Sequence, residues 1–141
     1  MKVIKKLWLY ALAFLALGSS CEKEVTSPDL SGCFEGVAIV GACPSILVVQ
    51  VKNIQIGEPW EFNGKSYSNV ISIENTHIVP DGLDLKYGDT FYFTLDIEAS
   101  KNGANCTKQV PCNDAMVMNF PNKKYCIKSI STQNCPDIHA D

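Results

Sequence analysis

The fold of this protein is decided by the stretch Thr90-Phe91-Tyr92-Phe93-Thr94-Leu95-Asp96-Ile97-Glu98. Apolar and polar side chains alternate strictly along it, and aromatic residues are frequent. A period of two places one set of side chains in the core and the other at the surface of a half-buried strand. The pattern predicts a β-strand whose inward side chains are Phe91, Phe93, Leu95 and Ile97.

Strand signals continue on the N-terminal side of this stretch. Residues 33–40 are rich in β-forming side chains and end in the turn residues of 41–45. Residues 46–52 follow as a nearly continuous apolar run. Such a pair of segments is typical of a hairpin that is buried on much of both faces.

A second hairpin is indicated by Asn63-Gly64, which stands between β-forming residues. Asn-Gly is the strongest short hairpin signal, because both central residues of its turn need a positive φ. A two-residue turn there places Phe62 opposite Lys65 and Trp60 opposite Tyr67. Trp60, Phe62 and Tyr67 then share one face.

The C-terminal part predicts one more hairpin. Residues 115–120 and 125–130 are β-rich and flank the turn residues 121–124. The polar tail that follows contains Cys135, which we expect to pin it to the body of the domain.

Many short strands separated by turn residues predict an all-β domain. The two architectures that fit are a small disulfide-stapled barrel and an immunoglobulin-like sandwich. The segment Leu85-Lys86-Tyr87-Gly88-Asp89 is similar to the approach to a strand in OB-type barrels, which favours the barrel.

The first 20 residues have the composition of an export signal. Lys2, Lys5 and Lys6 precede an apolar run over residues 7–17, and small residues fill 18–20. As a helix this run would span roughly 16 Å, about half of a ~30 Å bilayer core. The run therefore predicts a signal peptide that is removed rather than a membrane anchor.

Cys21 follows the small residues directly. Small residues before a cysteine resemble the lipobox of bacterial lipoproteins, in the relaxed form frequent in Bacteroidota, with Gly18 where leucine is usual. The resemblance implies that Cys21 becomes the N-terminus and carries three acyl chains, which suffice for a stable anchor in the outer membrane. An ordinary signal peptide with a disulfide-forming Cys21 is the alternative.

The mature chain would then have two parts. Residues 21–31 form the acylated cysteine and a flexible tether, and residues 32–141 form a single all-β domain. Glu22-Lys23-Glu24 resembles the surface-export signal of such lipoproteins, so the domain would face either the periplasm or the cell surface. A merely solvated tether is the alternative for these three residues.

Charge and composition argue against a nucleic-acid partner. Removing residues 1–20 takes away three lysines and leaves 9 basic against 15 acidic residues, a net charge of −6. The chain contains no arginine, which is the preferred side chain for phosphates and guanine edges.

Six cysteines remain when Cys21 is assigned to lipid, and an even number in an exported domain predicts a disulfide framework. They are Cys33, Cys43, Cys106, Cys112, Cys126 and Cys135. Cys106 and Cys112 bracket a short loop and are the pair that we expect to form a local bridge. Zinc binding is disfavoured because the chain has no C-x-x-C pair.

No motif predicts catalysis, a cofactor or a metal site. His77 and His139 lie near no nucleophile motif and are not spaced as a ligand pair. Asp81, Asp84 and Asp89 surround turns and lack the dense oxygen donors of a calcium loop. The sequence therefore favours a protein that is not an enzyme.

Two functions fit this description. The first is a non-catalytic binding module for a glycan or a protein at the cell envelope, with Trp60, Phe62 and Tyr67 as candidate ligand-binding residues. The alternative use of these aromatic side chains is to close a small core. The second function is a disulfide-rich inhibitor of a lysozyme-like enzyme or a protease, with residues 102–114 as its reactive loop.

Overall fold

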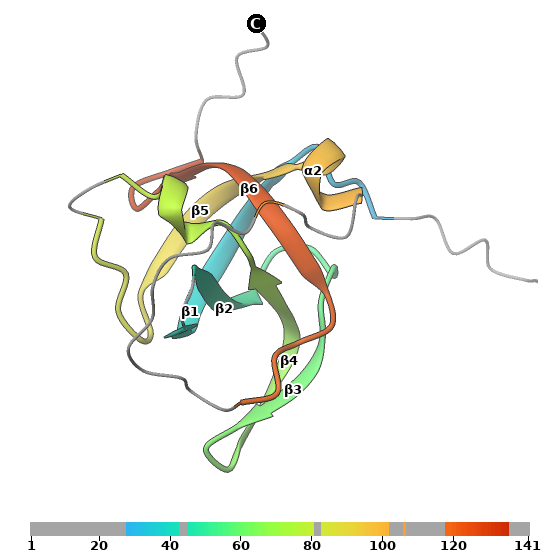
Figure 1. Ribbon diagram of the computed structural model, residues 1–141, viewed down its shortest axis with the longest axis vertical. Coiled ribbons are helices and arrows are strands. Elements are labelled where there is room, and N and C mark those ends of the chain that lie inside the picture. The colour runs from blue at the N-terminus through green and yellow to red at the C-terminus, as the bar shows by residue number, and fades with distance from the viewer. Residues whose placement is uncertain (1–27, 43–44, 81–82, 102–105, 107–117, 136–141) are drawn as a thin grey trace, which may run out of the picture.

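The computed structural model describes residues 28–42, 45–80, 83–101, 106 and 118–135, and within them it contains six strands (Figure 1). The strands are β1 (Cys33–Ala42), β2 (Ile46–Val51), β3 (Glu58–Phe62), β4 (Lys65–Ile73), β5 (Thr90–Asp96) and β6 (Lys124–Ser131). A 3-10 turn, η1 (Thr76–Ile78), follows β4, and a short helix, α2 (Ile97–Lys101), follows β5. The chain is an all-β protein, as predicted.

Five of these strands close into a barrel. β1 pairs with β2 and β5, β2 pairs with β4, and β5 pairs with β6, all antiparallel. A short parallel pairing of β4 with β6 completes the ring. This is the connectivity of an OB-type barrel, so the barrel is the architecture observed of the two that the sequence allowed.

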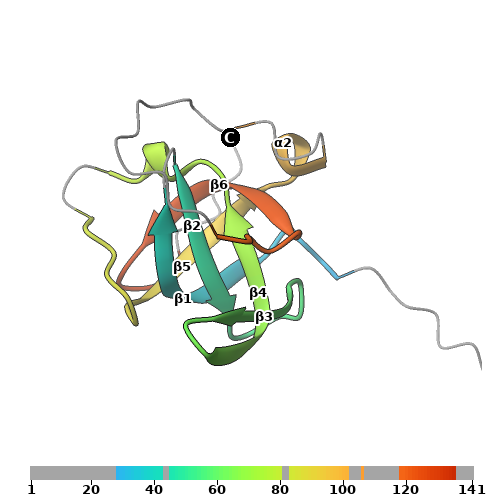
Figure 2. The ribbon, with the colours of Figure 1, turned by 60° about the horizontal axis from the view of Figure 1, so that its bottom comes forward.

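β3 lies outside the ring and pairs with β4 alone among the described strands. The β3–β4 hairpin projects from one end of the barrel, and α2 lies at the other end, in both Figure 1 and Figure 2. This projection matters for the site, because it places the hairpin turn beyond the barrel wall.

The alternating stretch forms β5, whose inward side chains are buried as predicted up to Leu95. The strand ends at Asp96, and Ile97 begins α2 and is only partly buried, so the prediction that Ile97 faces the core is wrong. The reason is a helix cap. Asp96 Oδ1 accepts a hydrogen bond from the Ala99 N–H at 3.0 Å, which satisfies a donor in the first turn of the helix.

The barrel interior is a single hydrophobic core. Its rings pack closely: Phe34 and Phe93 stack with centroids 5.4 Å apart, and Phe91 is tilted against Phe93 at 5.5 Å. Gly36 faces these rings, and a Cβ there would lie 2.6 Å from Val49 Cγ1. The absence of a side chain at Gly36 therefore lets the strands approach.

A second, smaller core lies on the opposite side of β1, β2 and β4. Its buried members are Ile39, Val48 and Val70. The partly buried side chains packed against them are Val40, Trp60, Phe62, Tyr67, Met118 and Phe120. β1 and β2 are thus buried on both faces, as their sequence predicts, and the β3–β4 hairpin helps to cover the outer one.

The predicted C-terminal hairpin is only half right. Residues 124–131 form β6, but residues 118–120, the described part of its expected partner, form no strand. β6 is flanked by β5 on one edge and β4 on the other, so both edges of the strand are already used. The 118–120 segment contributes instead to the second core.

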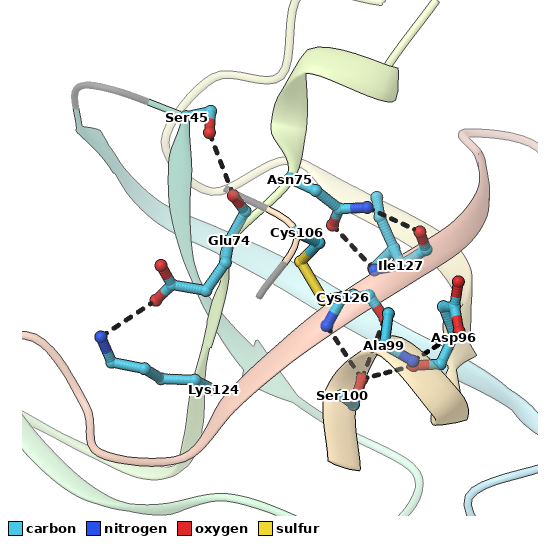
Figure 3. The surroundings of a disulfide bond; sticks show 10 residues. All are labelled: Ser45, Glu74, Asn75, Asp96, Ala99, Ser100, Cys106, Lys124, Cys126 and Ile127. Atoms are coloured by element: carbon cyan, nitrogen blue, oxygen red, sulfur yellow. Dashed lines mark hydrogen bonds and ion pairs between the residues drawn. A yellow bond between two sulfur atoms is a disulfide. The ribbon is translucent and has the colours of Figure 1, made fainter. Parts of the chain in front are cut away.

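Two disulfides join described parts of the barrel. Cys33–Cys135 joins the start of β1 to the C-terminal tail, as expected for Cys135, and Cys106–Cys126 joins the chain after α2 to β6 (Figure 3). The predicted Cys106–Cys112 bridge is wrong. Cys126 is fully buried beside α2, and its N–H donates a hydrogen bond to Ser100 Oγ of that helix. Cys106 comes only a few residues after α2 in the chain, so it can form its disulfide with Cys126. Cys43 and Cys112 lie outside the described residues.

Candidate ligand-binding groove

The β3–β4 hairpin has the turn and register that its sequence predicts. Asn63 and Gly64 have φ values of 50° and 73°, both positive. Trp60 pairs with Tyr67, and Phe62 pairs with Lys65. Because directly opposed residues of antiparallel strands point to the same side, the predicted sharing of one face by the three aromatic residues is confirmed.

These aromatic side chains form a continuous layer. The rings of Trp60 and Phe62 stack with centroids 5.3 Å apart and 8° between their planes. Tyr67 tilts against Trp60 at 6.3 Å. All three are partly buried against the second core, and the indole N–H of Trp60 donates to the Asn119 carbonyl at 2.8 Å. One side of the layer thus closes a core, while part of each ring remains accessible.

A fourth aromatic residue joins them from a different part of the chain. Tyr87 is 66% exposed, the most exposed large hydrophobic residue of the described chain. Its hydroxyl lies 3.3 Å from the hydroxyl of Tyr67. In the sequence, Tyr87 stood out only as part of the approach to a strand. Its position one residue before a turn glycine is the signal that could have marked it as a surface aromatic.

The turn that carries Tyr87 is held rigidly. Within the turn, the Asp89 N–H donates to the Lys86 carbonyl, and the Lys86 N–H donates to Asp89 Oδ2 at 2.7 Å. The turn is also paired with β1, because the Gly88 N–H donates to the Ala38 carbonyl and the Ala38 N–H donates to the Asp89 carbonyl. Gly88 has a φ of 88°, which glycine adopts without strain. Tyr87 is therefore an exposed ring on a fixed backbone.

The hairpin and this turn enclose a groove with a volume of about 390 Å³. Its lining residues are Ile39, Phe62, Asn63, Lys65, Tyr67 and Tyr87, and we name it the hairpin groove. A second depression of about 410 Å³ is bordered by Tyr67 and by Trp60, Glu61 and Asn119 among others. Tyr67 thus borders two open hollows.

At the polar end of the hairpin groove, Lys65, Tyr67 and Tyr87 shift one another's pKa values. Lys65 Nζ lies 4.9 Å from the centre of the Tyr67 ring, a cation–π distance. The neighbouring Tyr87 hydroxyl raises the pKa of Lys65. The hydrogen bond with Tyr67, with the Lys65 ammonium beside it, lowers the pKa of Tyr87, and the same hydrogen bond raises the pKa of Tyr67.

Side chains with other chemical roles do not gather in the described part of the chain. There, no three His, Cys, Asp or Glu residues lie close enough to hold a metal ion. His77 is exposed in η1, and Asp84 forms an ion pair with Lys86 at 3.7 Å. The Asp89 carboxylate accepts a hydrogen bond from the Lys86 N–H within its own turn. Asp81 and His139 lie outside the described residues.

The predicted anchor, Cys21, also lies outside the described residues. Within the ranges that the structure does describe, no helix has the length and hydrophobicity needed to cross a membrane.

Comparison of the chain with protein-family models, with curated proteins and with solved structures finds no match. The class that its own fold and surface define is a disulfide-bonded β-barrel with an aromatic surface groove. Any assignment of function therefore rests on the residues of this chain.

Proposed function

We propose that this protein is a non-catalytic binding module, lipid-anchored to a bacterial outer membrane through Cys21, whose hairpin groove takes a glycan chain. The observation that carries this proposal is the exposure of Tyr87 on a turn fixed by hydrogen bonds, within contact of Tyr67. Because the ring is exposed, it contributes little to the stability of the fold. Because its backbone is fixed, it loses little conformational entropy when a ligand binds. Surface aromatics arranged in this way usually mark an interaction site.

The chemistry of the groove favours a sugar. The faces of Phe62, Tyr67 and Tyr87 offer flat apolar surface for the C–H face of a pyranose ring. The tyrosine hydroxyls and the Asn63 amide offer hydrogen bonds to sugar hydroxyls. A volume of about 390 Å³ lies within the ~300–1,000 Å³ range of small-ligand sites. OB-type barrels also include oligosaccharide binders.

The position of the groove suits a tethered module. In Figure 1 the described chain enters at the upper right with residues 28–32, whereas the hairpin turn lies at the bottom. A tether from Glu22 to Ser31 could reach about 30 Å when extended. An anchor at Cys21 would thus leave the hairpin free to meet a ligand away from the lipid.

The experiment is capture of polysaccharide from the cell envelope by the purified protein. We expect capture by the wild-type protein and its loss with Tyr67→Ala. Ile78→Ala, which removes another exposed apolar side chain from η1, is the matched control and should capture normally. Equal capture by the Tyr67 variant and the wild type would refute the groove as the glycan site.

The anchor is tested separately by detergent phase partitioning. Cys21→Ser should move the protein from the detergent phase to the aqueous phase, because acylation needs the cysteine thiol. A Cys21→Ser protein that still partitions into detergent would exclude the lipoprotein assignment.

The inhibitor hypothesis remains a prediction from sequence. Within its proposed reactive loop, residues 102–114, the structure describes Cys106 alone, which is bound to Cys126. The hairpin groove therefore provides the better-supported function.

A further inference from the structure

Lys65 occupies a distinctive position in the hairpin groove. It is the first residue after the hairpin turn, and its side chain lies on the aromatic face because it pairs with Phe62. Among the residues that line the groove it is the one with a formal charge. Its ammonium lies 4.9 Å from the centre of the Tyr67 ring and interacts with the Tyr87 hydroxyl.

Three of the other described lysines have acidic partners. Lys86 pairs with Asp84, Lys101 with Glu98, and Lys124 with Glu74. No ion pair of Lys65 is present within the described residues. Its positive charge is thus positioned by aromatic groups on a regular hairpin and left available to a ligand.

The ligand chemistry follows from this juxtaposition of a cation with aromatic faces. A sugar ring stacked on Tyr67 or Tyr87 would bring its substituents to the end of the groove where Lys65 and Asn63 lie. A carboxylate there would accept hydrogen bonds from the ammonium and also form an ion pair with it, because both partners are charged. A neutral hydroxymethyl group would accept from the same ammonium without a charge of its own, and so more weakly.

We infer that the hairpin groove selects acidic sugars, of the uronic acid class, and that Lys65 binds their carboxylate. The inference rests on the proposed glycan-binding function and specifies its ligand. The mature chain is acidic overall, with a net charge of −6 after removal of the signal, so long-range attraction cannot supply this selectivity. The preference must arise at close range, from Lys65.

The test compares oligouronates with the same oligosaccharides after reduction of their carboxyl groups. Isothermal titration calorimetry on the purified full chain gives both affinities. We expect the wild type to bind the acidic form at least tenfold more tightly. Lys65→Gln should remove this preference and bind both forms alike, while Lys128→Gln, which changes an exposed lysine on β6, should retain it. Melting curves should show that both variants are folded.

The outcomes separate this inference from the proposed function. Equal wild-type affinity for the acidic and the reduced forms, or a preference that survives Lys65→Gln, would overturn the inference and leave glycan binding standing. Binding of neither form would overturn both. Binding of a glutamate-rich peptide in place of either sugar, with loss in Lys65→Gln, would also overturn both and identify a protein partner.

Discussion

The side-chain amide of Asn75 forms two hydrogen bonds with the backbone of Ile127, each 2.8 Å long (Figure 3). Its Nδ2 donates to the carbonyl, and its Oδ1 accepts from the N–H. The parallel pairing of β4 with β6 covers only Ser72 and Ile73 on the β4 side. Asn75 extends this pairing with a side chain, at the seam where the barrel closes.

Replacement of Asn75 should therefore open the seam. Asn75→Ala leaves a buried N–H and a buried carbonyl of Ile127 without their partner, and we expect a loss of roughly 2–4 kcal/mol of unfolding free energy. Asn53 makes the same two-bond pattern with the backbone of Cys33 and Glu35, but it is exposed to water. Asn53→Ala is the matched control and should lose less than about 1 kcal/mol. Urea unfolding measures both losses of stability. Equal losses would contradict the role of Asn75 in closing the barrel between β4 and β6.

Gly57 should tolerate no side chain. A Cβ there would lie 2.5 Å from the backbone N and O atoms of Val70, which cannot move without breaking the strand. We expect Gly57→Ala to cost about 3 kcal/mol. At Gly41 the nearest heavy atom to a new Cβ is 3.9 Å away, so Gly41→Ala should stay within ~0.5 kcal/mol of the wild type. Thermal unfolding that ranks the two variants in the opposite order would refute this packing.

Peptide mapping of the unreduced protein should recover Cys33–Cys135 and Cys106–Cys126. If all six domain cysteines pair, as their even number predicts, the third linked peptide must join Cys43 to Cys112. Mass spectrometry gives the connectivity directly. Two reactive thiols in the folded, oxidised protein would contradict the three-bridge framework.

The tyrosine pair should titrate in a fixed order. The hydrogen bond with Tyr67, together with the positive charge of Lys65, lowers the pKa of Tyr87, so Tyr87 should lose its proton first as the pH rises. Tyr67→Phe removes the larger of these causes and should return the Tyr87 pKa toward its ordinary value of about 10. Binding of an acidic ligand should weaken as Tyr87 becomes anionic. NMR titration of the ring signals tests this, and an unchanged Tyr87 pKa in Tyr67→Phe would contradict it.

Features set by neighbouring residues were predictable from the sequence. The inward placement of Phe91, Phe93 and Leu95 follows from alternation, and the hairpin register follows from Asn63-Gly64 alone. The strand ended earlier than alternation suggested, because the Asp96 side chain favoured a helix start over two more strand residues.

Features set by distant residues were not predictable. Asn69 illustrates this, because its amide bonds the backbone of Val51, Ile54, Ile56 and Gly57 at once, which only the folded chain brings together. The disulfide partner of Cys106 depends on where α2 ends relative to β6 in the folded protein. Tyr87 lies at the candidate site because its turn pairs with β1. No local sequence pattern encodes this pairing.

We propose that Tyr87, the exposed ring of the hairpin groove, serves ligand binding and not folding. The most direct test measures stability and glycan affinity together for Tyr87→Ala, with Trp60→Ala as the contrast because Trp60 packs on the second core. Trp60→Ala should lower the melting temperature by several degrees, which is about 1–2 kcal/mol. For Tyr87→Ala we predict a melting temperature within about 1 °C of the wild type and at least a tenfold loss of affinity. Wild-type affinity in Tyr87→Ala, or a fall in its melting temperature as large as that of Trp60→Ala, would contradict the account.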